Sequence, residues 1–250
     1  MHTGRMKLSG AIHAHTTLSH DGTMSLSELV DFVKARGYDY LAITEHSYDV
    51  DAEAMTNLRS QAELLSTPDF LIIPGLEFRC HGWIDIIGYG VTEPTSSENP
   101  AEVIDHIHRH GGVAIFAHPN IRPYPIDPSW VKMLDGAEIW NVSNEGKYLP
   151  QTGGINKFRE LASVNPELRA YTGLDLHRRE SYCYLSATTF ASDRTKDDIL
   201  RALKKGDFRS ESFWLTINSD GDLSPVAIVR IAVLRVFLNA ARFLRDLLLR

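Results

Sequence analysis

Apolar, strand-like runs alternate with helix-like runs along almost the whole chain of 250 residues. This alternation is typical of repeated βα units around a parallel sheet. The first helix has the clearest predicted boundaries, because Ser25 and Glu28 have the spacing of a capping box and Gly37 follows the last apolar position. Since α/β barrels routinely fill this length as one domain, the sequence predicts a single large α/β domain.

We expect the strands and helices in a regular order. Strands are expected at residues 8–15, 38–44, 70–73, 83–87, 112–117, 137–140, 169–172, 184–190 and 213–217. Helices are expected between residues 25 and 37 and at 52–65, 101–110, 128–134, 155–163 and 197–205. The composition changes after residue 220, so we expect residues 1–220 to form the α/β domain and residues 221–250 to form a separate basic helix.

Composition limits the partners and the compartment. Apolar residues make up 43% and charged residues 23% of the chain, as in ordinary globular proteins, and the net charge of −6 makes duplex nucleic acid an unlikely partner. Cys80 and Cys183 are too few for a disulfide framework, which favours a reducing compartment. Residues 1–10 lack the apolar segment of a signal peptide, so we expect a cytoplasmic protein.

Histidine and carboxylate residues recur at the ends of the predicted strands. His13 and His15 are two residues apart on the first strand, so they project from the same face and can hold one metal ion. Later strands end in the same residue types, at Glu45, His46, Glu77, His118, Asp175 and His177. Because the carboxyl ends of barrel strands converge on one face, we expect these side chains to meet. His, Asp and Glu without Cys favour Zn, Mn or Fe used for hydrolysis.

The segment IHAHTTLSHDG, from Ile12 to Gly22, carries a family resemblance together with the later motifs in the same order. It resembles the PHP family, the polymerase and histidinol phosphatase domains, over roughly residues 6–212. The resemblance implies an α/β fold, a distorted seven-stranded TIM-like (β/α) barrel, here followed by the amphipathic helix. It also implies two or three divalent metal ions (Zn, Mn or Fe) and hydrolysis of phosphate esters.

The family motifs assign metal ligands to individual positions. By this resemblance His13, His15, Glu77 and Asp175 hold one ion, and His20, His46 and His177 hold another. Glu77 would also bridge to a further ion bound by His118. The resemblance further makes Glu77, Asp175 and His177 the expected catalytic residues.

Three positions depart from the family pattern. The family often has Ser-Asp-Gly where this chain has Ser19-His20-Asp21-Gly22, so either His20 or Asp21 can be the ligand, and the spacing from His15 favours His20. Glu45 replaces the usual Asp, and we expect it to orient a histidine. Asp85 stands where many members have a His, which leaves the third ion open.

The implied reaction is attack of a metal-activated water on phosphorus, with the metals neutralising the phosphoryl oxygens. The expected substrate is a small phosphomonoester such as a nucleotide or a sugar phosphate. Four basic residues follow motif-bearing strands and are candidate clamps for an anionic substrate, the last two being preferred: Arg79, Lys147, Arg178 and Arg179. A C–N hydrolase using the same activated water, and a non-catalytic metal-binding regulatory module, are the alternatives.

The segment from Val226 to Arg250 contains five Arg and one Asp on an amphipathic helix. One side is predicted to carry Arg235, Asn239, Arg242, Arg245, Asp246 and Arg250. The other side is predicted to carry Val229, Val233, Val236, Phe237, Ala240, Leu244 and Leu247. The apolar side can pack on the barrel, or the helix can lie on a partner or on an anionic membrane, which would make the protein peripheral to the inner membrane surface.

Overall fold

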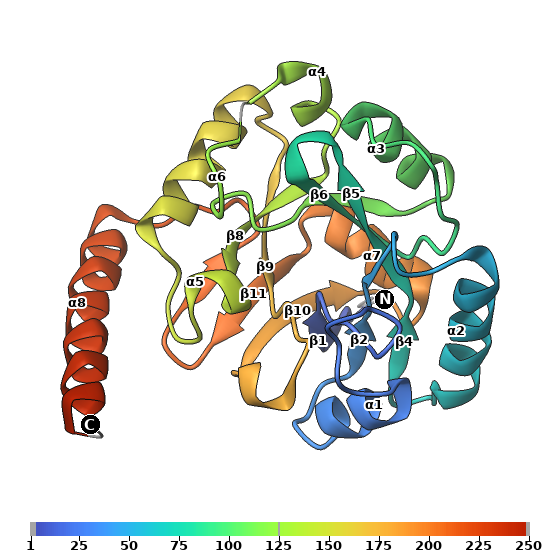
Figure 1. The fold of residues 1–250 in the computed structure, drawn as a ribbon, viewed down its shortest axis with the longest axis horizontal. Helices are drawn as coiled ribbons and strands as arrows, with labels where there is room; N and C mark the ends of the chain where they lie inside the picture. Colours follow the sequence, from blue (N-terminus) through green and yellow to red (C-terminus); the bar gives the residue numbers. More distant parts are fainter. Residues whose placement is uncertain (1–3, 125, 249–250) are drawn as a thin grey trace.

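The computed structural model describes residues 4–124 and 126–248, and their side chains as far as Ala240. The strands form two six-stranded sheets at the centre of the molecule (Figure 1). The first sheet has the order β12 (Thr216–Asn218), β11 (Phe208–Ser212), β10 (Leu185–Ala191), β1 (Met6–Ile12), β2 (Tyr40–Ala42) and β4 (Leu71–Ile73). The second has the order β3 (Glu45–His46), β5 (Gly75–Cys80), β6 (Ile84–Tyr89), β7 (Val113–Phe116), β8 (Gly136–Asn141) and β9 (Arg169–Gly173).

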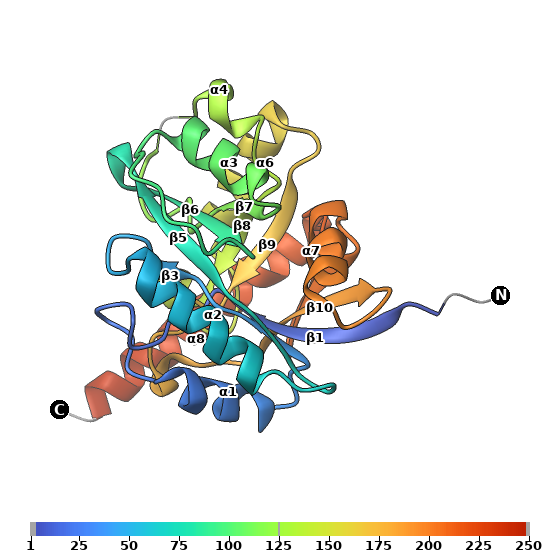
Figure 2. The ribbon, with the colours of Figure 1, turned by 90° about the vertical axis from the view of Figure 1, so that its right-hand side faces the viewer.

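Helices surround the sheets, as the two perpendicular views show (Figure 1 and Figure 2). They are α1 (Leu26–Lys34), α2 (Ala52–Leu65), α3 (Pro100–Arg109), α4 (Pro128–Val131), α5 (Val142–Glu145), α6 (Thr152–Val164), α7 (Lys196–Lys205) and α8 (Pro225–Leu248). Two 3-10 turns complete the order, η1 (His81–Trp83) and η2 (Arg179–Ser181). The mixed α/β class predicted from the alternation is confirmed.

Local sequence signals predicted several elements well. The Ser25 side chain accepts a hydrogen bond from the Glu28 amide, and the Glu28 carboxylate accepts one from the Ser25 amide, so the predicted capping box is present. The bounds of α2 match the predicted helix at 52–65. The predicted strand at 213–217 begins too early: Ser212 accepts hydrogen bonds from the Trp214 and Leu215 amides in a turn, and β12 starts only at Thr216.

The expected parallel barrel is not formed by the strand ladders. Parallel pairing is limited to β1 with β2, β2 with β4, β3 with β5, β7 with β8 and β8 with β9. The strands β5 and β6 pair antiparallel, because the short η1 connection cannot carry a crossover between parallel strands. Among the described residues the ladders form two open sheets.

Hydrogen bonds beyond the strand ends join the two sheets where the histidines lie. The amide of Leu176, which follows β9, donates to the carbonyl of His13 at 3.2 Å, and the His15 amide donates to the carbonyl of Leu176 at 3.1 Å. The Thr44 amide, between β2 and β3, donates to the carbonyl of Ala14 at 2.9 Å. The segment after β1 is therefore held between both sheets, and its side chains meet residues from each.

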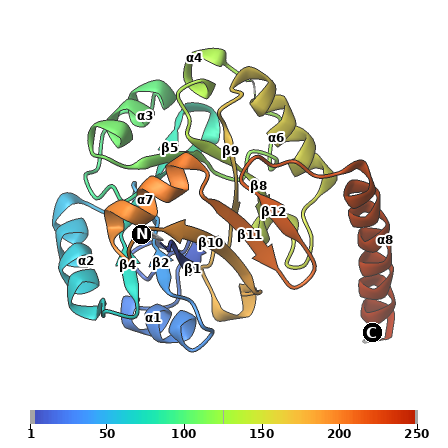
Figure 3. The ribbon, with the colours of Figure 1, turned by 180° about the vertical axis from the view of Figure 1, so that it is seen from behind.

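The helix α8 lies at one side of the molecule (Figure 3). Arg235 faces inward and donates hydrogen bonds to the carbonyls of Leu149 at 2.5 Å and Glu145 at 3.0 Å, while Ile231 on the same side is buried. The apolar residues Val236 and Phe237 are each 67% exposed. Of the alternatives for the apolar stripe, packing on the protein is therefore not observed, and the stripe faces outward as far as the side chains are described. None of the described helices is long and apolar enough to cross a membrane.

Candidate metal centre

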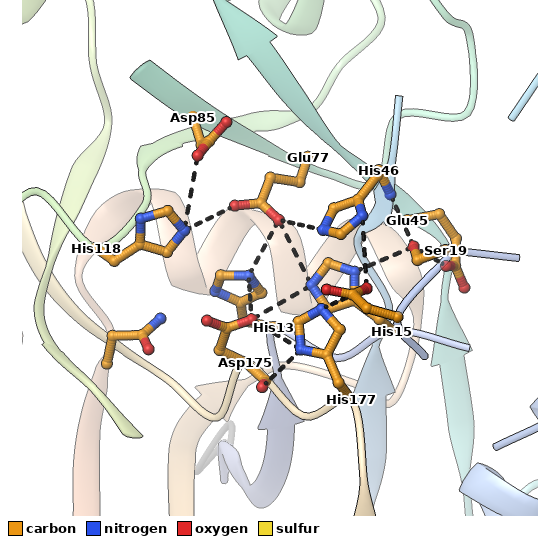
Figure 4. Close-up of polar contacts among 12 residues, drawn as sticks. His13, His15, Ser19, Glu45, His46, Glu77, Asp85, His118, Asp175 and His177 are labelled. Atoms are coloured by element: carbon orange, nitrogen blue, oxygen red, sulfur yellow. Dashed lines mark hydrogen bonds and ion pairs between the residues drawn. The ribbon is translucent and has the colours of Figure 1, made fainter. Parts of the chain in front are cut away.

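Histidine and carboxylate side chains from several elements converge at the end of β1 (Figure 4). His13 and His15 follow β1, Glu77 lies in β5, and Asp175 follows β9. Oε2 of Glu77 lies 3.5 Å from Nε2 of His13 and 3.5 Å from Nε2 of His15. Oδ1 of Asp175 lies 3.5 Å and 3.6 Å from the same two nitrogens. Four potential ligand atoms therefore face one point.

These separations fit a metal ion better than direct hydrogen bonds. Zinc binds His nitrogen and carboxylate oxygen at about 2.0–2.2 Å, so neighbouring ligands of a tetrahedral ion are about 3.3–3.6 Å apart. The Nε2 atoms of His13, His15 and His177 are buried and have no hydrogen-bond partner among the described residues. Because such an unpaired group costs about 1–3 kcal/mol, a bound cation explains why the fold tolerates three of them together. The residues present fit a divalent metal ion.

A second group of side chains lies beside the first. Nε2 of His46 is 3.5 Å from the same Oε2 of Glu77, and the ring of His177 stacks on that of His15 with centroids 4.1 Å apart. His15, His46 and His177 have ring nitrogens close enough to share an ion. The resemblance grouped His46 with His177, and the geometry brings both to this place.

The structure separates the two candidates His20 and Asp21. Oδ1 of Asp21 is buried, without a hydrogen-bond partner among the described residues, and lies 3.2 Å from Nε2 of His177. The side chain of His20 is 62% exposed and its Nδ1 lies 2.8 Å from Oδ2 of Asp49. His20, His46 and Asp49 form a further group that could hold an ion, and this group shares His46 with the one above. Asp21 therefore meets His177 and His20 meets His46, so both candidates lie beside the second group and both line the cavity above it.

Glu77 links these groups to His118. Its other oxygen, Oε1, lies 3.0 Å from Nε2 of His118, and Oδ2 of Asp85 lies 4.0 Å from the same nitrogen. Glu77, Asp85 and His118 could hold a further ion, with the Asp85 carboxylate in the place of the family's usual histidine. Asp85 is also paired with Arg79, which competes for its negative charge.

Carboxylates control the protonation of the histidines. Burial lowers the pKa of His118, but the hydrogen bond and charge of Glu77 outweigh it and raise that pKa to about 9. For His15, burial dominates and lowers the pKa to about 4. Burial raises the pKa of Glu77, but the charges and hydrogen bonds of His13 and His118 hold it well below its usual value. Negative charge is therefore retained at the centre, and a cation has to displace the proton of His118 to bind there.

Glu138 is a positioning residue that the sequence analysis missed. Its buried carboxylate in β8 accepts a hydrogen bond from Nδ1 of His13 at 2.7 Å, from the His118 amide at 2.8 Å and from Nδ2 of Asn141 at 2.9 Å. Contact through Nδ1 directs the Nε2 of His13 toward Glu77 and Asp175. A glutamate within the apolar strand 137–140 was the available sequence signal.

The predicted orienting role of Glu45 involves an intermediate residue. The Ser19 hydroxyl donates to Oε2 of Glu45 at 2.6 Å and lies 3.3 Å from Nδ1 of His15, and it also accepts from the His46 amide at 3.0 Å. Glu45 therefore contacts Ser19 rather than a histidine. Glu45 holds the Ser19 hydroxyl, and the Ser19 hydroxyl in turn positions the ring of His15.

Three residues of the centre adopt left-handed backbone conformations. The φ angles are 59° at His13, 32° at His118 and 49° at Asp175. Each such conformation costs on the order of 1–3 kcal/mol in a residue other than glycine. The strain lies at the positions where the chain leaves β1, β7 and β9, and it turns these three side chains toward the cluster.

Arg178 and Arg179, the preferred candidates for binding an anionic substrate, lie away from the cluster. Beyond His177 the chain turns through η2 toward α1, so Arg179 lies 3.7 Å from Glu28 and Arg178 is exposed. A cavity of about 520 Å³ opens over the cluster, and neither of them lines it. The arginine that does line it is Arg79, the less favoured candidate. The direction of the chain after His177 is the physical reason for this correction.

A comparison with models of known protein families matches the part of the chain that carries most of these ligand residues. Residues 11–160 match the family model of the PHP domain. This chain belongs to the PHP domain family. The matched part contains His13, His15, His46, Glu77 and His118, whereas Asp175 and His177 lie beyond it. A search of curated proteins finds no match.

Solved structures share the fold of this PHP domain. A two-domain protein of Bacteroides vulgatus, described as containing a predicted PHP-like metal-dependent phosphoesterase, superimposes with a TM-score of 0.63 at 20% identity, covering 86% of this chain and 67% of that one. PsfC of Pseudomonas syringae gives 0.60 at 14% identity, covering 93% and 99%. A protein of Bifidobacterium adolescentis, described as a putative metal-dependent phosphoesterase, gives a TM-score of 0.53 at 17% identity, covering 78% of this chain and 94% of that one.

Proposed function

We propose that this PHP domain is a metal-dependent hydrolase of small phosphate monoesters. The observation that supports the proposal best is the set of four ligand atoms from His13, His15, Glu77 and Asp175, spaced 3.5–3.6 Å apart as an ion requires. Family membership and the fold of the similar structures point in the same direction. With His46, His118, His177 and Asp21 beside them, there are ligands for two ions and for a third at Asp85.

The residues of the chain would hold and orient the reacting groups. When bound, the divalent ions supply an activated water and positive charge opposite the phosphoryl oxygens. Glu77 presents both carboxylate oxygens to the site, which makes it the residue best placed to be shared. Glu138 fixes His13, and Asn144 donates to Oδ2 of Asp175 at 3.0 Å, so neither ligand needs to reorient.

A small substrate fits the site better than a duplex. The cavity of about 520 Å³ over the cluster has the size of a ligand pocket. The chain has a net charge of −6, and binding along a DNA backbone relies on many basic contacts. We therefore expect monoesters to be preferred over duplex DNA.

The direct test is hydrolysis by the full chain reconstituted with Mn²⁺ or Zn²⁺. Glycerol phosphate and ribose 5-phosphate should be hydrolysed, duplex DNA should not, and a chelator should abolish turnover until the metal is restored. Turnover of N-acyl substrates without ester hydrolysis would favour the C–N hydrolase. Tight metal binding without turnover of either class would favour a regulatory module.

We also propose that α8 contacts an anionic membrane surface. Its outward side carries the exposed residues Val229, Val233, Val236 and Phe237, and exposed Tyr148 and Trp214 lie beside it, lining a cavity with Leu234 and Leu238. Aromatic residues of this kind are enriched at membrane interfaces. The segment 226–250 has five Arg against one Asp, of which Arg235 is turned toward the protein, and each of the other basic residues that lies near an anionic membrane contributes about 1 kcal/mol.

Substitution of Phe237 tests this contact in the full chain. We expect the unaltered protein to float with vesicles of phosphatidylcholine and phosphatidylserine, and not with phosphatidylcholine alone. Phe237→Glu should reduce the bound fraction about tenfold or more, because one large apolar side chain is lost from the interface. Leu64→Glu is the matched control, since Leu64 on α2 is 83% exposed. No flotation at low salt, or a dimer disrupted by Phe237→Glu, would contradict the membrane contact.

A further inference from the structure

A row of aromatic rings and arginines extends from the metal centre along one wall of the cavity. The ring of Tyr48 stacks on that of His46 with centroids 5.0 Å apart and an angle of 15° between the planes. Cζ of Arg79 lies 5.1 Å from the ring of Tyr48 and 5.1 Å from the ring of Trp83. Cζ of Arg122 lies 5.2 Å from the ring of Trp83. We call Tyr48, Arg79 and Trp83, which line the cavity, the aromatic wall, and Arg122 lies beyond this lining.

The aromatic wall is held in place by contacts from separate parts of the chain. Tyr48 follows β3, Arg79 lies in β5 and Trp83 ends η1. Arg79 is fixed by its ion pair with Asp85 and by a 3.5 Å contact from Nη2 to the hydroxyl of Tyr48. The Tyr124 hydroxyl donates to the carbonyl of Trp83 at 2.8 Å. The wall is thus a fixed part of the site.

Trp83 is the most exposed ring of the wall. It is 59% exposed and has a φ of 63°, a left-handed conformation that a tryptophan rarely adopts. Tryptophan, with an apolar ring and a polar N–H group, is enriched at binding interfaces, and the position of Trp83 at the edge of the cavity makes its ring available to a ligand. Tyr48, Arg79 and Trp83 all line the cavity that contains Glu77 and Asp175.

The chemistry of the wall selects a planar ring. Ring faces and guanidinium groups stack on aromatic and heteroaromatic rings, and this contact tolerates different rings because each has a π-face. A sugar ring can also stack on such a face through its C–H groups, but its hydroxyl groups additionally need hydrogen-bond partners, whereas a planar ring gains from the stacking face alone. Because the wall begins at His46 in the metal centre, a phosphate held at the cluster leaves its alcohol group beside Tyr48 and Trp83.

We infer that the aromatic wall binds the alcohol part of the substrate and makes the enzyme prefer phosphate esters that carry an aromatic or heteroaromatic ring. This inference rests on the proposed phosphoesterase function and names the substrate class for it. Trp83 supplies the stacking face, while Arg79 and Tyr48 support it from the side of the metal centre.

Two pairs of esters test the inference with the metal-loaded full chain. Benzyl phosphate and cyclohexylmethyl phosphate differ in ring planarity, with similar size and leaving group, and adenosine 5′-phosphate differs from ribose 5-phosphate by the base alone. We expect kcat/KM to be about tenfold higher for the member with the planar ring in each pair. Trp83→Leu should bring both ratios close to one without loss of bound metal, and Tyr48→Leu should lower them.

Phe213→Leu is the matched aromatic control, because Phe213 is an exposed ring in the turn between β11 and β12 and does not line this cavity. Ratios near one in the unaltered protein, or ratios unchanged by Trp83→Leu, would overturn the inference while leaving the phosphoesterase intact. If neither ester of a pair is hydrolysed, the proposed function fails, and calorimetric affinities of benzyl and cyclohexylmethyl phosphate then decide about the wall. Equal affinities would overturn it.

Discussion

Asp175→Asn should abolish metal-dependent ester hydrolysis, because a neutral amide cannot replace a carboxylate that binds a cation. We expect kcat to fall about 10³-fold or more and each chain to bind about one ion fewer. Oδ1 of Asp175 lies within 3.6 Å of Nε2 of both His13 and His15. Asparagine also tolerates the left-handed backbone at this position, where φ is 49°, so the fold should be retained. The measurements are turnover of glycerol phosphate and elemental analysis.

The control for Asp175→Asn is His81→Ala. The side chain of His81 is exposed and pairs with Glu98 outside the cluster. This variant should keep both its metal and its activity. If His81→Ala were as damaging, or if Asp175→Asn kept full metal content and turnover, the cluster would not be the catalytic centre.

Glu138→Gln should weaken metal binding about 10–100-fold and lower the free energy of unfolding by about 1–3 kcal/mol. The Glu138 carboxylate accepts from His13, from the His118 amide and from Asn141, and a glutamine amide can accept through one oxygen only. One donor would remain unpaired, and the His13 ring would lose the partner that directs its Nε2. Metal affinity from chelator competition and unfolding by urea measure the two effects.

Asp135→Asn separates a metal-specific effect from general destabilisation. Asp135 is also a largely buried carboxylate that accepts from a histidine ring, at 2.9 Å from His108, and from a backbone amide, at 2.9 Å from Ala114. It lies outside the cluster, so Asp135→Asn should lower stability and leave metal affinity unchanged. Equal metal affinities in the two variants would make Glu138 a structural residue only.

Sequence-local signals determined much of the fold and most of the ligand set. The capping box at Ser25 and the span of α2 depend on neighbours within one helical turn, so both could be read from the chain. The histidines of the centre could be assigned because the spacing of His13 and His15 and the order of the later motifs match the pattern of the PHP family. The expected shared strand face is not what brings His13 and His15 together, because β1 ends at Ile12 and His13 has a left-handed backbone. The structure brings these together with His46, Glu77, His118, Asp175 and His177.

Contacts between distant segments decided the rest. Strand direction and sheet order depend on which edges pair, so the two open sheets were not predictable from an alternation of strands and helices. Only the fold brings Asp21 to His177, which is far along the chain, and places His20 beside Asp49. In the same way, Arg79 lines the cavity because Trp83 and Tyr48 pack against it, while the chain after His177 carries Arg179 to Glu28.

The helix α8 shows the same division most clearly. Its sequence determined an amphipathic helix, because the periodicity of apolar and basic residues is a local property. Only the tertiary structure decided which side faces the protein. Arg235 reaches the carbonyls of Glu145 and Leu149, and these hydrogen bonds turn Val236 and Phe237 outward. A helical wheel contains no information about the carbonyl group of Glu145, which lies 90 residues before Arg235 in the chain.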